Sequence, residues 1–241
     1  MSSKTIPIRK DSAWRGTADC VSCSMREMVL FADLSTEDFE HIHAPIDDLE
    51  FAPGETLQRS GEQAASMMTL RAGMVKLVRS TVDGRQRIVR VLRPGDVIGP
   101  EAVIGGRFDN DAVALTNAKV CRIPVHVVQG LVDQTPKLYQ KLMEKWHRSL
   151  QDADDWLAEM NFGTARQRVA GLVRKMRANG DASVVTLFSR EDMGAMLDLK
   201  LETVSRTLNA FVREGMLEPL DKVGRVYRIS NVDMLFDPDA A

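Results

Sequence analysis

Three cysteines are the residues of this 241-residue chain with the clearest capacity for metal chemistry. Cys20 and Cys23 form a Cys-x-x-Cys pair, and Cys121 follows about a hundred residues later in AKVCRIP. Two thiolates at this spacing can bind one iron–sulfur cluster, but the same spacing also suits zinc or a redox dithiol. Taken alone, Cys121 fits a structural cysteine that shares a strand face with Ile123. An odd cysteine count without an export signal argues against a disulfide framework.

A second group of polar residues has the types and spacing needed to read DNA. The segment KLETVSRTLNAFVREG predicts a helix with an apolar side and, opposite it, Glu202, Ser205, Arg206 and Asn209. Arginine can bond bidentately to guanine, and glutamate can accept a hydrogen bond from the amino group of cytosine. The alternative is the exposed charged face of an ordinary helix.

The elements around this helix favour the DNA-binding interpretation. SREDMGAMLDL predicts a preceding helix that Ser189 caps, with Gly194 small enough for a close helix crossing. After the second helix, GMLEPLDKVGRVYRIS predicts a basic two-stranded wing. The second helix of such a pair enters the major groove through its N-terminal half. We therefore predict that Ser189, Arg190 and Arg225 also lie at the DNA surface.

The middle of the chain shows two further sequence patterns, one typical of β-strands and one typical of a long helix. Between about 49 and 124, short β-type runs alternate with Gly and Pro pairs, as in an all-β sandwich or barrel. MVKLVRS and QRIVRVLR flank Asp83-Gly84 and predict a hairpin. From about Pro136 a heptad-like pattern predicts one long helix that pairs with its own copy, or else packs on its own domain. Its predicted seam is Leu142, Trp146, Leu150, Ala153, Leu157 and Met160.

Composition narrows the class of protein. The net charge is −2, and no apolar run approaches the ~20 residues that span a bilayer. The first residues lack the apolar core of a signal peptide, so we expect a cytoplasmic protein without a membrane partner. No P-loop, G-x-G-x-x-G or nucleophile motif is present, so we expect no enzyme. A β-roll that only binds a protein partner is a third alternative, against which the helix pair counts.

The order of β-roll, long helix, LDLKLETVSRTLNAFVREGML and wing resembles the CRP/FNR family of bacterial regulators over about residues 19–235. The resemblance implies an α+β fold with an N-terminal cyclic-nucleotide-binding-like β-roll, a long dimerisation helix and a C-terminal winged helix-turn-helix. We expect a flexible segment at 1–18, the sensor domain at 19–134, the dimerisation helix at 135–163 and the DNA-binding domain at 164–241.

The resemblance also implies partners. Glu202, Ser205 and Arg206 match the Glu-x-x-Ser-Arg pattern of the FNR branch, which reads a TTGAT-type half-site repeated as an inverted pair. Double-stranded DNA, a second copy of the chain and RNA polymerase are the partners so implied. In that branch a carboxylate on the helix seam opposes pairing, and the aligned residue here is Ala153. We therefore expect a homodimer that persists, at least in part, without a cofactor.

The sensor departs from two patterns of the family. In the cyclic-nucleotide branch an Arg-Ser or Arg-Thr pair binds the phosphate, but VIGPEAVIGGRFDNDAVAL carries Asn110-Asp111 there, and a carboxylate repels phosphate. The FNR branch holds a 4Fe–4S cluster with four cysteines, but Val29 occupies the place of the third. The resemblance thus implies an iron–sulfur cluster on Cys20, Cys23 and Cys121.

The fourth ligand is then not a cysteine. Glu27, Asp19 or a histidine could supply it, or one iron could be open to solvent or a small molecule. A three-iron cluster, a two-iron cluster and no cluster are the other options. A regulator of the same family with another sensor, using thiol oxidation, zinc, haem or an unknown small molecule, is the runner-up.

Overall fold

The computed structural model describes residues 46–81, 84, 86–134, 136–160, 162–177 and 183–236. These described residues divide into two compact units, one made of those from 46 to 75 and from 92 to 145, and the other of those from 76 to 91 and from 146 to 236. Cys20 and Cys23, the segment 1–18 and the position of Val29 lie outside the described residues, so the expectations placed on them stay predictions.

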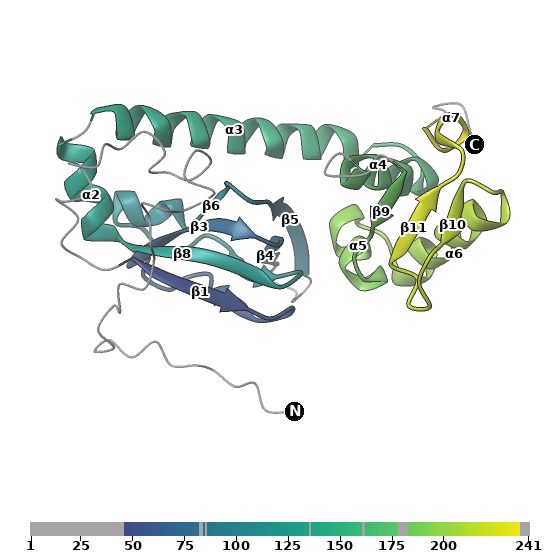
Figure 1. Ribbon diagram of the computed structural model, residues 1–241, viewed down its shortest axis with the longest axis horizontal. Helices are drawn as coiled ribbons and strands as arrows, with labels where there is room; N and C mark the ends of the chain where they lie inside the picture. Colours follow the sequence, from purple (N-terminus) through teal and green to yellow (C-terminus); the bar gives the residue numbers. More distant parts are fainter. Residues whose placement is uncertain are drawn as a thin grey trace. The chain divides into compact units, whose positions relative to one another are not determined.

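The β-type runs form two four-stranded sheets, as the turn spacing predicts (Figure 1). The orders are β1-β8-β3-β6 and β2-β7-β4-β5, so the predicted hairpin strands β4 and β5 are neighbours. Gly73 is required between β3 and β4, because its φ is 83° and a Cβ there would lie 2.1 Å from the carbonyl oxygen of Asn117. The elements are β1 Asp47–Phe51, β2 Thr56–Gln58, β3 Ser66–Ala72, β4 Val75–Ser80, β5 Gln86–Leu92, β6 Val97–Ile98, the 3-10 helix η1 Pro100–Ile104, β7 Asp111–Ala114 and β8 Ala118–Pro124.

Two helices follow β8, the last strand of these two sheets. They are α2 (Val125–Gln134) and α3 (Pro136–Met160). Buried residues from the strands, η1, α2 and α3 form one hydrophobic core cluster in the first unit. Ile123 of β8 belongs to it and Cys121 packs against it, as predicted for residues that share a strand face.

The long helix α3 lies within the predicted range 135–163, but its predicted seam was partly wrong. Leu142 is only 1% exposed and belongs to the core cluster of its own protomer, and Met160 is 0% exposed. These side chains pack inside the protomer and cannot meet a second copy. The outward apolar residues follow each other at steps of four and three along another side of the helix. They are Tyr139, Met143, Trp146, Leu150, Ala153 and Leu157.

The C-terminal unit contains the helix pair and the wing that the sequence predicts, together with further elements around them. The helix α4 (Ala165–Arg177) packs on the second helix of the pair and on β9 and α7. The three-stranded sheet has the order β10-β11-β9, so the wing strands extend an earlier strand (Figure 1). The elements are β9 Val184–Thr186, α5 Arg190–Leu197, α6 Leu201–Arg213, β10 Leu217–Pro219, β11 Val226–Ile229 and α7 Val232–Phe236, the last of which was not predicted.

Candidate nucleic-acid interface

Ser189 caps α5 as predicted. Its hydroxyl oxygen accepts a hydrogen bond of 3.0 Å from the backbone N–H of Asp192 and donates one of 2.7 Å to the Asp192 carboxylate. These bonds satisfy a free N–H group of the first turn and fix where α5 begins. The side chain thus has a structural role, and its contact with DNA stays a prediction.

The turn between α5 and α6 depends on Gly194. A Cβ on Gly194 would lie 2.6 Å from the carbonyl oxygen of Leu199, closer than side-chain atoms approach. The backbone N–H of Leu199 donates to the Gly194 carbonyl (3.1 Å), and Asp198 ends α5 with a φ of 54°. The predicted need for a small residue here is correct, because the backbone of the turn lies directly on the helix.

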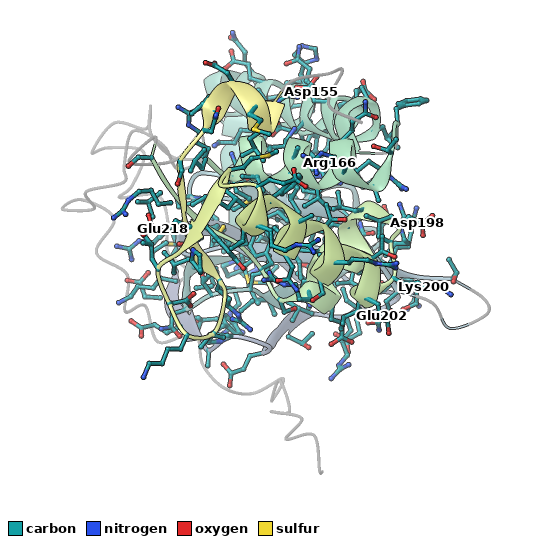
Figure 2. The ribbon with its side chains drawn as sticks, turned by 90° about the vertical axis from the view of Figure 1, so that its right-hand side faces the viewer. Asp155, Arg166, Asp198, Lys200, Glu202 and Glu218 are labelled. Atoms are coloured by element: carbon teal, nitrogen blue, oxygen red, sulfur yellow. The ribbon has the colours of Figure 1, made fainter. Side chains whose placement is uncertain are left out.

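The helix α6 has one buried side and one polar side. Val204, Leu208 and Phe211 are buried on the core side. On the other side Glu202, Arg206 and Asn209 are exposed, and Ser205 is half-buried beside them. In Figure 2 the side chains of Lys200 and Glu202 extend outward near the start of this helix. The predicted reading residues therefore share one surface of α6.

The far end of α6 is tied to α4. Arg166 pairs with the carboxylate of Glu214, which follows the last residue of α6, and its guanidinium lies 4.9 Å from the Phe211 ring centroid. The hydrogen bond from Arg166 lowers the pKa of Glu214 below its ordinary value of 4.5. This pair holds the C-terminal end of α6 in place, away from the end that would enter a groove.

The wing is shaped by one carboxylate. The Asp221 side chain accepts hydrogen bonds from the backbone N–H groups of Arg225 (2.8 Å) and Val226 (3.0 Å). These bonds, with that from Val226 the largest cause, lower the pKa of Asp221. Arg225 is exposed on the wing, whereas Arg228 pairs with Glu218 at 2.7 Å. Arg225 therefore stays a predicted DNA contact, and part of the predicted positive charge of the wing is neutralised.

Arg190 joins α5 to the wing. Its Nη2 donates to the carbonyl oxygen of Gly224 (2.9 Å) and to the hydroxyl of Tyr227 (2.6 Å), and the guanidinium lies 5.8 Å from the Tyr227 ring centroid. The sequence suggested a DNA contact for Arg190, but the structure gives it this intramolecular role. Its contact with DNA is untested.

Cys121, the described member of the cysteine set, is half-buried on β8. Its Sγ donates to Oδ1 of Asp48 on the neighbouring strand β1 at 3.3 Å, and Asp48 also accepts two hydrogen bonds from Arg71. Among the residues that the structure describes, no group of three or more His, Cys, Asp or Glu could hold a metal ion. A thiolate-ligated site is consistent with Cys121, but only if further thiolates come from Cys20 and Cys23.

Two family models match the chain. The model for a cyclic nucleotide-binding domain matches residues 48–135, and that for a Crp-like helix-turn-helix domain matches 167–237. The chain belongs to the CRP/FNR family. Other regulators are similar over most of it: the fumarate and nitrate reduction regulatory proteins of Salmonella typhi and Escherichia coli are each 26% identical over 223 residues, covering 90% of this chain and 88% of theirs.

Solved structures of CRP/FNR proteins agree with the fold. FixK2 from Bradyrhizobium japonicum is 27% identical, with a TM-score of 0.71 over 81% of this chain and 98% of that one. A CRP-family transcriptional regulator from Thermus thermophilus, 24% identical, has a TM-score of 0.67 over 78% and 94% of the two chains. Together with the Crp-like helix-turn-helix match, the FNR-named relatives and FixK2, these findings identify the chain as a DNA-binding transcription regulator of the CRP/FNR type.

The stretch that binds the cyclic phosphate in some CRP/FNR regulators has other partners here. Asp111, in the predicted place of the Arg-Ser pair, accepts a hydrogen bond from the backbone N–H of Ser60 (2.7 Å). Phe108 is buried, and its ring lies directly against Gly99, where a Cβ would come within 2.7 Å of it. Glu101 accepts from the backbone N–H of Asp109 at 3.3 Å. The stretch also carries Arg107, whose guanidinium donates to the carbonyl oxygen of Gly61 (2.7 Å). Glu101, Asp109 and Asp111 outnumber this one cation, and a net negative charge disfavours a phosphate.

Proposed function

We propose that this regulator binds an inverted-repeat, TTGAT-like DNA site as a homodimer, with α6 of each protomer in the major groove. The observation that supports this most directly is the shared surface of Glu202, Arg206 and Asn209 at the reading side of α6. Arg206 is exposed and can present its guanidinium to the edge of a guanine, and Glu202 can accept from a cytosine amino group. The two-fold symmetry of the dimer sets half-site centres about one helical turn apart.

The test is fluorescence anisotropy with a duplex selected from random sequence, compared with an unrelated duplex. Arg206→Ala should weaken binding by about 1–3 kcal/mol and relax base preference at one position of each half-site. Arg206→Lys is the matched control, because it keeps the charge but loses the bidentate geometry. Equal losses on both duplexes would show that Arg206 contacts phosphate alone.

The second copy is proposed to pair along the outward apolar stripe of α3. Tyr139, Leu150 and Leu157 are 55%, 60% and 59% exposed, although all are apolar or aromatic. Their heptad spacing is that of a coiled-coil seam, and the seam centre at Ala153 carries no carboxylate. Two carboxylates facing each other across the axis would repel and lose solvation. We therefore propose a dimer that forms without a bound cofactor.

Analytical ultracentrifugation of cofactor-free protein at micromolar concentration tests this. The wild type should sediment as a dimer, Ala153→Asp should dissociate in part, and Leu150→Asp should dissociate further. Gln151→Asp is the control, because Gln151 is exposed beside the stripe, and this variant should stay dimeric. A clean wild-type monomer would contradict the proposal.

The signal is proposed to be oxygen or redox state, sensed through Cys20, Cys23 and Cys121. The FNR-named relatives support this, and so does the half-buried thiol of Cys121 on β8. An iron–sulfur cluster held by these three cysteines and one non-cysteine ligand, of the 4Fe–4S type or a smaller one, would supply sensitivity to oxygen. The chain's own part is to hold the thiolates and to transmit the change through β8 and α3. Direct thiol oxidation is the second candidate, because the same thiols would serve it.

Purification without oxygen distinguishes the two. A cluster predicts visible absorption and iron that are lost in air, and replacing any one of the three cysteines by serine should remove most of both. A Cys121→Ser variant with its full cluster would return Cys121 to an ordinary core role. Protein without iron that nevertheless loses DNA binding on oxidation, and regains it on reduction, would favour the thiol mechanism.

The remaining parts of the proposal concern the cellular setting. We propose RNA polymerase as a partner, a cytoplasmic location and no catalytic activity of its own. Within the part of the chain that the structure describes, no helix has the length and apolar character needed to cross a membrane. Pull-down of RNA polymerase by the protein on its selected duplex tests the partner.

A further inference from the structure

Cys121 lies between two oxygen-bearing side chains on one face of its sheet. In the pairing of β1 with β8 the residue opposite Cys121 is Asp48, and in the pairing of β3 with β8 it is Thr69. Side chains of directly opposed residues on neighbouring strands project from the same face. A carboxylate, a thiol and a hydroxyl therefore stand in one row across three strands.

The separation of the thiol and the carboxylate is that of two ligands on one metal ion. The Sγ of Cys121 lies 3.3 Å from Oδ1 of Asp48. A sulfur and an oxygen bound to one tetrahedral ion, at about 2.3 Å and about 2.0–2.2 Å from it, lie about 3.5 Å apart. A four-iron cubane binds one protein ligand on each iron, which places its ligand atoms about 6 Å apart. The observed distance therefore fits a shared iron and does not fit two irons of a cubane.

The surroundings of these two groups also suit a metal ligand. The Asp48 side chain is 37% exposed, so iron can reach it, and two hydrogen bonds from Arg71 (2.6 and 2.7 Å) orient it, as is usual for ligating carboxylates. Thr69 is only 1% exposed, and its hydroxyl has no hydrogen-bond partner among the described residues. Leaving a buried hydroxyl unpaired is unfavourable, and a metal-bound thiolate at Cys121 would give it an acceptor.

We propose that Asp48 is the non-cysteine ligand of a two-iron cluster. It shares one iron with Cys121, and Cys20 and Cys23 bind the other. A two-iron cluster takes two protein ligands on each iron, and Rieske centres show that one of the irons can be held by ligands other than cysteine. On binding, the Cys121 thiol releases its proton to solvent, whereas the Asp48 carboxylate binds as the anion. This inference rests on the proposed binding of iron by the three cysteines.

The test uses the full-length protein purified without oxygen, with iron and acid-labile sulfide analysis and Mössbauer spectroscopy. The wild type should carry two irons and two sulfides per protomer, with the irons in different environments, because only one of them has an oxygen ligand. Asp48→Ala should lose iron to a chelator at least about ten-fold faster than the wild type. Asp48→Cys should keep the cluster, and its two irons should become spectroscopically alike.

Glu50→Gln is the matched control, because Glu50 is an exposed carboxylate two residues further along the same face of β1, paired with Lys119. This variant should keep the iron content and the chelation rate of the wild type. Circular dichroism on heating should show that all variants are folded. Three or four irons in the wild type, or an Asp48→Ala variant that holds iron as firmly as the wild type, would overturn the inference while the cluster stands. If the wild type holds no iron, the proposed cluster fails and the inference with it.

Discussion

The guanidinium of Arg190 donates a 2.6 Å hydrogen bond to the hydroxyl of Tyr227, which links the first helix of the pair to the wing. The same nitrogen reaches the carbonyl of Gly224 at the wing turn. Tyr227 itself is buried and Arg190 is half-buried, so the bond is partly shielded from water. The wing is thus held to α5 by a side chain that the sequence placed at the DNA surface.

Weakening this link should loosen the wing. Tyr227→Phe removes one hydrogen bond and should cost about 0.5–1.5 kcal/mol. Arg190→Ala removes that bond and the bond to Gly224, and should cost more. Amide hydrogen exchange should become faster in β10 and β11 and stay unchanged in β3. If exchange of the wing amides is the same in Arg190→Ala, the link does not hold the wing.

Replacing the glycine at the turn of the helix pair by alanine should have the opposite effect on stability from the same change at a glycine in α2. Gly194→Ala should destabilise the protein by about 1–3 kcal/mol, because the new methyl group meets the Leu199 carbonyl. Gly130→Ala, in α2 with nothing within 4 Å of the new methyl, should stabilise by about 0.5–1 kcal/mol. Thermal unfolding of both variants measures the two signs. A Gly194→Ala variant as stable as wild type would show that the turn can relax.

Acid should weaken the tie between α4 and the end of α6. The pKa of Glu214 is lowered by Arg166, so the pair stabilises the fold fully above pH 4.5 and loses this contribution as pH falls through the folded-state value. Glu214→Gln should therefore flatten the decline of thermal stability below pH 4.5. In an Arg166→Gln background the same change should have little effect. If both backgrounds respond alike, another group causes the decline.

Cyclic AMP should not act on this regulator. Asp111 occupies the predicted phosphate position, and its carboxylate is already bonded to the Ser60 backbone. Calorimetry should detect no binding at micromolar concentration, and anisotropy should show no change in DNA affinity. Micromolar binding that also tightens the DNA complex would contradict this prediction.

Local patterns were sufficient for most of the architecture. The strands of the first domain, α3 and the helix pair follow from alternation, heptad spacing and caps, and Ser189 and Gly194 have the roles that their chemistry predicts. It was harder to predict which apolar side of α3 packs within the protomer and which faces outward. Leu142 and Leu150 are equally apolar, and only the tertiary packing shows that the first is covered by its own chain.

The hydrogen-bond and ion-pair partners of the charged side chains also could not be predicted from the sequence. The sequence shows that Arg190 and Arg228 are basic and near the wing, but it does not show that Tyr227 and Glu218 are within bonding distance of them. Such pairs depend on strand register and on side-chain direction between distant segments.

The helix α3 has two apolar sides, and they serve different purposes. One side packs inside the protomer and the other faces outward. Leu142 contributes to the integrity of the protomer, whereas Leu150, two turns further on, is free to respond to what lies outside it. If two copies pair along the outward side of α3 as proposed, changes near Leu150 would alter how strongly they associate without lowering the stability of either one. On that arrangement, substitutions on one side of α3 would change the response to a signal in small steps, while the residues on the other side preserve the fold.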